Sequence, residues 1–369
     1  MLRNWTNWLF DTATRRLDGP LMVTLMVLAT LSIAVIYSAS GGGSFERALG
    51  QVRNFGVALI ALWVVANIPP QQLMRLAIPI YLIGLALLVA VALGGEVRNG
   101  AKRWLNLGFI TLQPSEIMKI GVPLVLAWYF HRREEMLSWQ DYAIAILLLA
   151  IPTGLVFKQP DLGTSILVFA SGFFVIFLAG LSWKVIIAAG AGFAALVPFI
   201  WPHLKEYQRQ RVLTFLDPAA DPLGSGYHIT QSTIAIGSGG VLGKGWLSGT
   251  QTKLDFIPER STDFILAVFG EEFGLIGNLL LIALYLIVIG RGLMIALNAP
   301  TTFSRLIAGA VSLTFFTYAF VNIGMVSGIL PVVGVPLPLV SYGGTAAVSM
   351  LVGFGILMSV STHKQLVST

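Results

Sequence analysis

The segment LDFIPERSTDFILAVFGEEFG, residues 254–274, joins a polar stretch directly to a long apolar one. Asp263 stands at the junction, and the apolar run begins at Phe264. A carboxylate at the edge of hydrocarbon costs free energy unless water, a cation or a substrate meets it, so Asp263 is a candidate functional residue. The alternative is a helix cap, because Ser261 and Thr262 suit the N-cap position and an acid in the first turn complements the helix dipole. The residues alone leave both interpretations open.

The composition places this junction in a membrane protein. Of the 369 residues, 56% are hydrophobic and 11% are charged, whereas roughly a quarter of the residues of a soluble domain are charged. Apolar runs of about twenty residues are long enough to cross a bilayer as helices. The sequence therefore predicts an all-α polytopic integral membrane protein with a single membrane domain over residues 1–369. Its apolar runs predict about ten transmembrane helices, near residues 20–38, 50–67, 73–93, 114–131, 141–158, 161–180, 183–201, 263–290, 304–328 and 338–361.

The composition also excludes several kinds of chemistry. Cysteine is absent and the four histidines are scattered, which excludes disulfides, thiolate metal sites and cysteine nucleophiles. The net charge is +6, but the basic residues are spread over the loops between apolar runs. This distribution argues against nucleic acid as a partner and favours membrane lipids or an anionic lipid-linked substrate.

Basic residues in the short loops set the predicted orientation, because cytoplasmic loops carry an excess of Lys and Arg. A modest excess falls on the side of the N-terminus, which predicts that both termini are cytoplasmic. Arg98, Lys102 and Arg103 are exceptions, since they lie on the outer loop before the fourth apolar run. They belong either to a ligand-binding site or to an ordinary solvated loop.

The turn GAKRWLNLGFITLQPSEIMK, residues 100–119, combines charged residues with a helix start on the outer side. Pro114 suits the first turn of a helix. Glu116 and Lys119 lie three residues apart, hence on one helix face and able to pair. They form either an ion pair that satisfies itself or part of the lining of a polar cavity.

A second outer turn, KQPDLGTS, spans residues 158–165. Pro160 is expected to end one helix, and Asp161 can cap the next. A lysine and an aspartate at a tight membrane turn are costly, so Lys158 and Asp161 are candidate ligand-binding residues. A structural hairpin turn is the alternative.

Residues 202–262 form one large extracytoplasmic loop between the seventh and eighth predicted helices. The loop contains too many apolar residues for disorder, which predicts short amphipathic helices on the outer membrane face. Its glycine-rich part, GSGGVLGKGW, matches neither of two phosphate-binding motifs. Ser238 stands where a Walker loop needs glycine, and Leu242 stands where the dinucleotide fingerprint needs it. No nucleotide site follows.

The segment GILPVVGVPLPLVSYGG, residues 328–344, places three prolines and several glycines at membrane depth. Such a composition predicts a broken helix or re-entrant loop, which is tolerated only where it lines protein or a water-filled cavity. The expected cavity opens on the same outer side as Asp263. A plain turn between two helices at the membrane rim is the alternative.

Taken together, these segments resemble the shape, elongation, division and sporulation (SEDS) family over nearly the whole chain. The resemblance is carried by GAKRWLNLGFITLQPSE, QPDLGTS, RVLTFLDPAADPLGSGYHITQSTIAIGSGG, GKGW, FIPERSTDFILAVFGEEFG and GVPLPLVSYGG. It implies a peptidoglycan glycosyltransferase that polymerises lipid II into glycan strands during cell-wall elongation and maintenance of rod shape. It further implies an active site on the outer face of the cytoplasmic (inner) membrane and a class B penicillin-binding transpeptidase as partner.

The resemblance also implies roles for individual residues. Asp263 matches the family's essential aspartate and is expected to take the proton of the acceptor sugar's 4-hydroxyl, a contribution of roughly 10²–10⁴-fold. Polyprenyl diphosphate leaves as an anion, so no second carboxylate is needed as general acid. The substrate-binding residues implied by motif match are Arg103, Trp104, Glu116, Lys119, Lys158, Asp161, Arg211 and Ser341.

Within this set, Arg103, Lys119 and Lys158 are expected to bind the diphosphate. Glu116 and Asp161 are expected to orient those cations, the sugars or a divalent ion. Arg211 and Ser341 are weaker candidates because either could stabilise local structure only. A Mg or Mn ion is a possible cofactor, although the sequence has no carboxylate cluster with dedicated ligand spacing.

Two other functions fit parts of the same pattern. A flippase for lipid-linked precursors also needs many helices and a polar cavity, and Glu271 and Glu272 lie roughly 12 Å inward from Asp263 at about 1.5 Å per residue. A flippase needs access from both faces, whereas nearly all other acids at the membrane edge are predicted outside. A non-catalytic scaffold for the transpeptidase is the third possibility.

Overall fold

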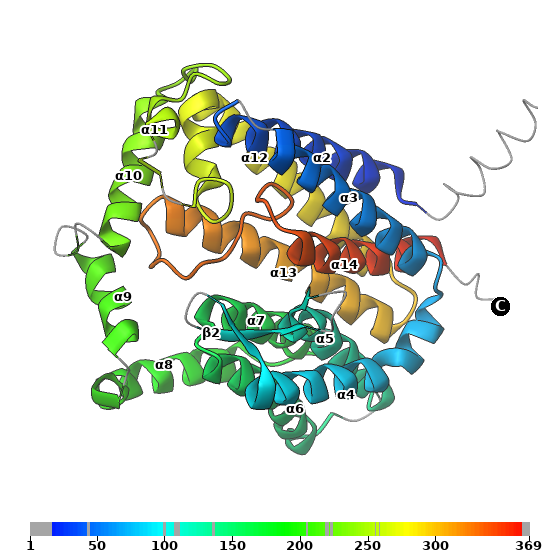
Figure 1. Ribbon diagram of the computed structural model, residues 1–369. Coiled ribbons are helices and arrows are strands. Elements are labelled where there is room, and N and C mark those ends of the chain that lie inside the picture. The colour runs from blue at the N-terminus through cyan, green and yellow to red at the C-terminus, as the bar shows by residue number, and fades with distance from the viewer. Residues whose placement is uncertain are drawn as a thin grey trace, which may run out of the picture.

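The computed structural model describes residues 17–42, 45–98, 101–106, 111–134, 137–203, 206–217, 221, 224–254, 256–257 and 259–363. Long helices occupy the predicted apolar runs (Figure 1). They are α2 (Gly19–Ala39), α3 (Phe45–Ala66), α4 (Pro70–Gly94), α5 (Pro114–Arg132), α6 (Trp139–Lys158), α7 (Leu162–Leu178), α8 (Trp183–Ile200), α12 (Ile265–Leu297), α13 (Thr302–Val326) and α14 (Gly344–Thr362). The predicted polytopic helical architecture is therefore confirmed.

Seven helices of the described chain are long and apolar enough to cross a membrane: α2, α3, α4, α6, α12, α13 and α14. Helices α7 and α8 are apolar but shorter by the same measure. Helix α5 falls outside both groups, and it carries Glu116 in its first turn and two basic residues in its last. The count of ten spans stays a prediction.

Local signals set several helix starts, and those of α5 and α7 were expected. Proline occupies the first helical position of α4 and α5, where its missing N–H leaves no hydrogen bond unmade. The Asp161 carboxylate accepts a hydrogen bond from Thr164 N at 3.1 Å and caps α7. That capping role confirms the predicted turn between α6 and α7.

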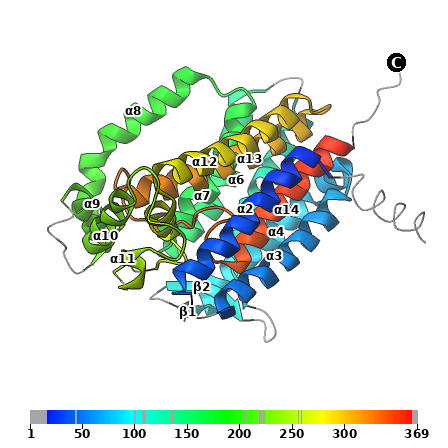
Figure 2. The same cartoon turned by 90° about the horizontal axis from the view of Figure 1, so that it is seen from above.

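Helix α13 lies in the middle of the bundle and contacts α5, α7, α12 and α14. Helix α14 packs along α3, and α4 packs along α5 (Figures 1 and 2). Helix α8 stands apart from this core, and nearly all of its side chains are exposed. The polar residues discussed below gather around the first turns of α5, α7 and α12 and the last turns of α13.

The large loop contains the predicted short helices. They are the 3-10 turn η1 (Trp201–His203), α9 (Glu206–Leu216), α10 (Ser225–Ser238) and α11 (Thr250–Lys253). Helix α10 packs against α12 and α13, and Figure 1 shows α8, α9 and α10 following one another along one edge of the molecule. A location on the membrane face stays a prediction.

A small antiparallel sheet between α4 and α5 was not anticipated. Its strands are β1 (Glu96–Arg98), β2 (Ala101–Asn106) and β3 (Thr111–Leu112), in the order β1-β2-β3. Glu96 pairs with Trp104, and Leu105 pairs with Leu112. The sheet carries Arg103 and Trp104 on β2 and leads directly into the first turn of α5.

Two predicted spans need correction. Helix α12 is interrupted at Gly274, where φ is 64° and ψ is −160°. A Cβ at Gly274 would lie 2.3 Å from Gly243 N, so the close approach of the glycine-rich loop requires glycine there. The last span begins at Gly344 instead of residue 338, because Leu339 has a φ of 59°, which a right-handed helix does not accommodate. Ser341 therefore precedes α14.

Candidate active site

Asp263 lies immediately before α12, where the main chain meets the segment 327–343 that connects α13 to α14. Ser341 links the two. Its hydroxyl donates to Thr262 O at 2.6 Å and accepts from Leu337 N at 2.8 Å. Tyr342 N donates to Ser261 O at 2.8 Å. The proline-rich segment thus lines the site instead of forming a plain turn between helices.

The Asp263 carboxylate is half-buried and forms no hydrogen bond or ion pair with the described residues. Burial, the largest cause, and the negative charges of Glu259 and Asp161 together raise its pKa to about 6, and the positive charge of Arg103 opposes them. These Coulomb effects place Arg103, Asp161 and Glu259 around Asp263. A half-buried acid with a raised pKa and no partner has the properties of a general base.

The helix-cap interpretation of this stretch is wrong. Phe264 occupies the N-cap position of α12, and no side chain caps it. The Thr262 hydroxyl donates instead to Glu259 Oε2 at 2.7 Å, and Ser261 Oγ accepts from Arg47 at 3.3 Å. The polar residues before the helix therefore stabilise the preceding turn.

Arg103 joins the small sheet to the turn between α6 and α7. Its Nε lies 3.4 Å from Asp161 Oδ2, and its Nη2 donates to Pro160 O at 2.8 Å. Trp104 is half-buried on the same strand. Lys158, at the end of α6, is exposed and has no ion pair with another described residue. This wall of the site therefore carries one anchored cation and one cation available to a ligand.

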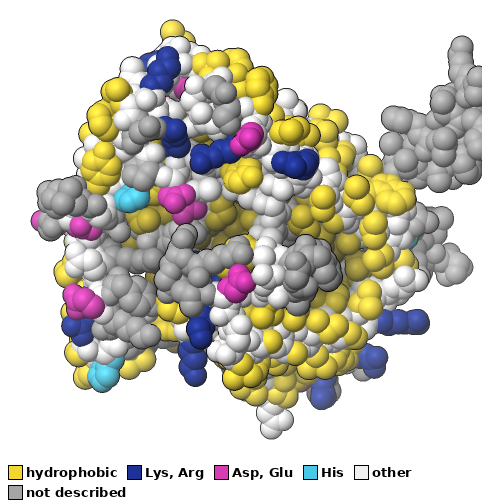
Figure 3. Space-filling view, in the orientation of Figure 1, with side chains coloured by type: hydrophobic (Ala, Val, Ile, Leu, Met, Phe, Trp, Pro, Cys, Tyr) yellow, Lys and Arg dark blue, Asp and Glu magenta, His cyan; other side chains and the backbone are white. Residues whose placement is uncertain are grey.

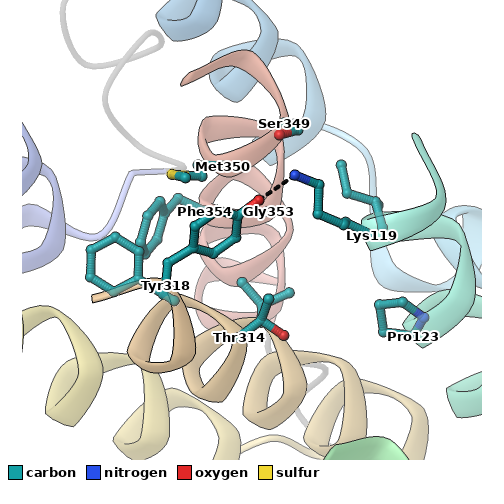
Figure 4. A pocket seen from close by; sticks show the side chains of 11 residues that line it. Lys119, Pro123, Thr314, Tyr318, Ser349, Met350, Gly353 and Phe354 are labelled. Carbon is teal, nitrogen blue, oxygen red and sulfur yellow. Dashed lines mark hydrogen bonds between the residues drawn. The ribbon is translucent and has the colours of Figure 1, made fainter. Parts of the chain in front are cut away.

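Glu116 and Lys119 form the predicted ion pair. Lys119 Nζ lies 2.6 Å from Glu116 Oε1, and both side chains are buried. Lys119 also donates to the Tyr318 hydroxyl, and the Ser349 hydroxyl donates to Glu116 Oε2 at 2.5 Å. Figure 4 shows the Lys119 ammonium hydrogen-bonded to the Tyr318 hydroxyl. Both side chains line a cavity of about 50 Å³ between α5, α13 and α14.

A larger groove opens beside this pair. Its volume is about 610 Å³, and it lies between α3, α4, α5 and α14. Most of its lining is apolar, and its polar side chains are Asn54, Thr111, Gln113, Glu116, Thr345 and Ser349. Gln113 also donates to Asp161 Oδ2 at 3.5 Å, which connects the mouth of the groove to the wall that carries Arg103.

Charged side chains are unevenly distributed over the surface. Figure 3 shows the acidic groups of this face on the left and in the centre, whereas the right-hand part is mostly hydrophobic with basic groups at its lower edge. The described residues contain no group of three or more metal-ligating side chains that could hold a metal ion. Participation of Mg or Mn stays a prediction. Arg211 lies on α9, and its side chain is outside those described.

Glu271 and Glu272 contact other segments of the described chain. Glu271 Oε1 accepts hydrogen bonds from Lys244 Nζ at 2.7 Å and from Thr250 N at 2.8 Å, and Glu272 accepts from the Ser38 hydroxyl. Lys244 N also donates to Glu271 O at 3.0 Å. Both acids therefore contact the glycine-rich loop or the end of α2, and the flippase stays an alternative prediction.

Sequence analysis missed two residues of this region. Lys244 was tested only against phosphate-binding motifs, and its partner lies 27 residues away along the chain. Asn322 was passed over although an asparagine inside an apolar run is itself a signal, because a buried amide needs partners. Its side chain donates to Asp263 O at 2.8 Å.

Comparison with known proteins places the chain among cell-wall enzymes. The family model FTSW_RODA_SPOVE, described as "Cell cycle protein", matches residues 19–366. "Peptidoglycan glycosyltransferase MrdB" of Escherichia coli K12 is 54% identical over 355 residues, covering 95% of each chain. "Stage V sporulation protein E" of Bacillus subtilis is 31% identical, covering 94% of this chain and 98% of that one.

Two solved structures have the same fold. One, described as "Structural coordination of polymerization and crosslinking by a peptidoglycan synthase complex", has a TM-score of 0.81 and 32% identity. It covers 93% of this chain and 97% of that chain. The rod shape determining protein RodA of Thermus thermophilus has a TM-score of 0.71 and 28% identity, covering 93% and 96%.

Proposed function

The chain belongs to the SEDS family of cell cycle proteins, the family of FtsW, RodA and SpoVE, and on that premise we propose how its site works. It is a multi-pass membrane protein and a peptidoglycan glycosyltransferase. Its substrate is lipid II, and its product is a growing glycan strand made during cell-wall elongation and maintenance of rod shape. The observation that carries the mechanism is the unpaired, half-buried Asp263 carboxylate.

Asp263 acts as the general base. The 4-hydroxyl oxygen of the acceptor sugar attacks the anomeric carbon of the donor, its proton passes to the Asp263 carboxylate, and the bond to polyprenyl diphosphate breaks. Because the Asp263 pKa is about 6, the group is mostly ionised at neutral pH and is a stronger base than an ordinary aspartate. Proton transfer of this kind contributes roughly 10²–10⁴-fold to the rate.

Cations stabilise the leaving diphosphate. Lys158 is exposed and has no described partner, so it can bind a phosphate oxygen without breaking an existing contact. Arg103 is held by Asp161 and Pro160 and presents its remaining donors from a fixed position. Lys119 is committed to Glu116 and Tyr318, so its contact with diphosphate requires an exchange of partners.

The apolar groove beside Glu116 suits a lipid-linked substrate. A volume of about 610 Å³ between α3, α4, α5 and α14 accommodates part of a polyprenyl chain, and its apolar lining compensates the removal of that chain from water. Gln113, which lines the groove, donates to Asp161 on the wall that carries Arg103. The sugar and diphosphate of a substrate bound there would therefore face the catalytic carboxylate.

The remaining parts of the proposal concern location and partner. The chain resides in the cytoplasmic membrane with both termini inside and Asp263 on the outer face, as the basic loops predict. A class B penicillin-binding transpeptidase crosslinks the strands that this chain makes. The similarity to a chain from a complex of polymerization and crosslinking supports this partner.

The test is polymerisation of labelled lipid II in liposomes by the wild type and Asp263→Asn, with the transpeptidase present. The wild type should make long strands, and Asp263→Asn should be slower by roughly 10²–10⁴-fold. Glu259→Gln is the control, because it keeps the Asp263 carboxylate and only lowers its pKa, so it should change the rate far less than Asp263→Asn. Undiminished strand synthesis by Asp263→Asn contradicts the mechanism, and lipid scrambling without strands favours a flippase. A variant that binds the transpeptidase but makes no glycan excludes the scaffold.

A further inference from the structure

Asn322 is an amide in an apolar environment. It lies on α13 in the stretch Phe320–Gly324, close to the end of that helix, and its side chain is 0% exposed. Burying an amide costs free energy unless hydrogen bonds replace those made to water. A residue of this kind in a membrane helix therefore needs a structural or functional reason.

The amide joins two main-chain carbonyls that are far apart in sequence. Its Nδ2 donates to Asp263 O at 2.8 Å and to Val335 O at 2.7 Å. Its Oδ1 has no partner among the described residues. The opposite orientation would aim Oδ1 at two carbonyl oxygens and leave both without a donor, so the two contacts determine the orientation.

Both contacts flank the Asp263 carboxylate. Val335 follows Gly334, which has a φ of 71°. A Cβ at Gly334 would lie 3.3 Å from Asp263 Oδ2, so this part of the segment 327–343 lies directly against the carboxylate. The amide therefore connects the backbone that carries the acid to the backbone that forms its wall.

The carboxylate has no partner of its own in the described chain. An unpaired side chain takes its position from the backbone that carries it and from the surfaces around it. Ser341 anchors the neighbouring Thr262 O, but the carbonyl of Asp263 itself is bound by Asn322. Loss of the amide would remove the hydrogen bonds that hold both the Asp263 carbonyl and the Val335 carbonyl.

We propose that Asn322 is a positioning residue for glycosyl transfer, which sets the Asp263 carboxylate against the proline-rich segment by bridging their main chains. This inference rests on the proposed role of Asp263 as base. A displacement of about 1 Å of a reacting group can lower a rate by roughly 10²-fold. The amide does not contact substrate, so its loss acts through Asp263 and lowers kcat more than it changes KM.

A second signature separates positioning from simple stability. The groups around Asp263 are Glu259 in the preceding turn, Asp161 at the start of α7 and Arg103 on β2, and burial is the largest cause of its raised pKa. A carboxylate released toward water loses part of that burial. The acid limb of the pH dependence of kcat should therefore move to lower pH even as kcat falls.

The experiment compares Asn322→Leu, which keeps the side-chain volume without donors, with Asn278→Leu. Asn278 is partly buried and donates to Gly274 O at 2.8 Å, away from Asp263. Both variants are assayed for lipid II polymerisation with the transpeptidase present. Asn322→Leu should lower kcat about 10- to 100-fold, leave KM within about threefold, and shift the acid limb downward, whereas Asn278→Leu should leave the limb unchanged.

A folded Asn322→Leu with the wild-type kcat and acid limb overturns the proposal. If that variant does not fold, Asn322→Ser, which retains one donor, takes its place and should give an intermediate kcat and a smaller shift. If the acid limb of the kcat–pH profile is then unchanged in Asn322→Ser, the positioning role of Asn322 is excluded. Full activity of Asp263→Asn would instead contradict the proposed base, whatever Asn322 does.

Discussion

Two acids on the same short stretch of chain have opposite surroundings. Asp263 is half-buried and forms no hydrogen bond or ion pair with the described residues. Glu271 is fully buried, and its Oε1 accepts from Lys244 Nζ, Thr250 Oγ1 and the main-chain N–H groups of Thr250 and Gln251. Burial therefore does not identify the reactive acid. Availability does, because a carboxylate saturated with donors is stabilised as an anion and takes up a proton poorly.

The difference follows from what each backbone brings near. The glycine-rich loop approaches α12 closely enough to present N–H donors and Lys244 to Glu271. Around Asp263, the described contacts involve its main chain, and its carboxylate is left to face the site. Glu271 therefore stabilises the fold, and Asp263 is available for chemistry. The predictions below test this contrast from the largest expected effect to the smallest.

Glu271→Ala should destabilise the protein by about 3–5 kcal/mol, because the Lys244 ammonium and the main-chain N–H groups of Thr250 and Gln251 lose their shared acceptor. Asp263→Ala should cause no comparable loss of stability, since the Asp263 carboxylate has no hydrogen-bond or ion-pair partner among the described residues. Thermal unfolding in detergent measures both. The contrast fails if the two variants lose the same stability.

Lys119→Met should cost about 3 kcal/mol, because Glu116 would remain buried without its cation. The double variant Lys119→Met with Glu116→Gln should recover most of that stability, since no unpaired charge remains. Unfolding and polymerisation are measured on the same samples. If the double variant also recovers activity, Lys119 is a structural ion-pair residue only; persistent inactivity supports the diphosphate contact.

The activity should depend on pH through Asp263. Because the base must be ionised and its pKa is about 6, polymerisation should fall tenfold for each pH unit below about 6 and level off above it. The stability of the folded protein changes with pH in the opposite direction. The folded pKa exceeds the ordinary value of 3.8, so the stabilising contribution of protonated Asp263 is complete below about pH 4 and is lost as the pH rises through about 6.

Parallel measurements of rate and unfolding temperature from about pH 4.5 to 8 check both signs. Asp263→Asn serves as the reference, because it cannot titrate, and the wild type should become less stable relative to it as pH rises. An acid limb near pH 4 would show that the carboxylate is not perturbed by the site. A flat profile across this range would remove Asp263 as the base.

Lys158→Ala should raise KM for lipid II about tenfold, the equivalent of one charge-assisted hydrogen bond of about 1.4 kcal/mol. Its unfolding temperature should not change, because the side chain is exposed and unpaired within the described chain. Lys184→Ala, an exposed lysine at the start of α8, is the control. Equal KM values for the two variants would exclude Lys158 from the diphosphate site.

Much of the helical fold was predictable because its signals are local. A hydrocarbon environment requires apolar runs whose backbone hydrogen bonds close within the segment, so the runs themselves mark the helices. Pro114 at the start of α5, Asp161 at the cap of α7 and the pair of Glu116 with Lys119 involve residues within one turn of each other. Each was expected from spacing alone, and each is present.

Tertiary structure decided the contacts that make the site. The sequence by itself determined where helices form and which side chains carry charge, since both depend on neighbours a few residues away. It did not determine that Arg103 meets Asp161, that Lys244 meets Glu271, or that Asn322 bridges Asp263 and Val335. These pairs are separated by long stretches of chain, and only the packing of whole helices brings them together. That packing also decides that the Glu271 carboxylate is surrounded by hydrogen-bond donors and that the Asp263 carboxylate has none among the described residues.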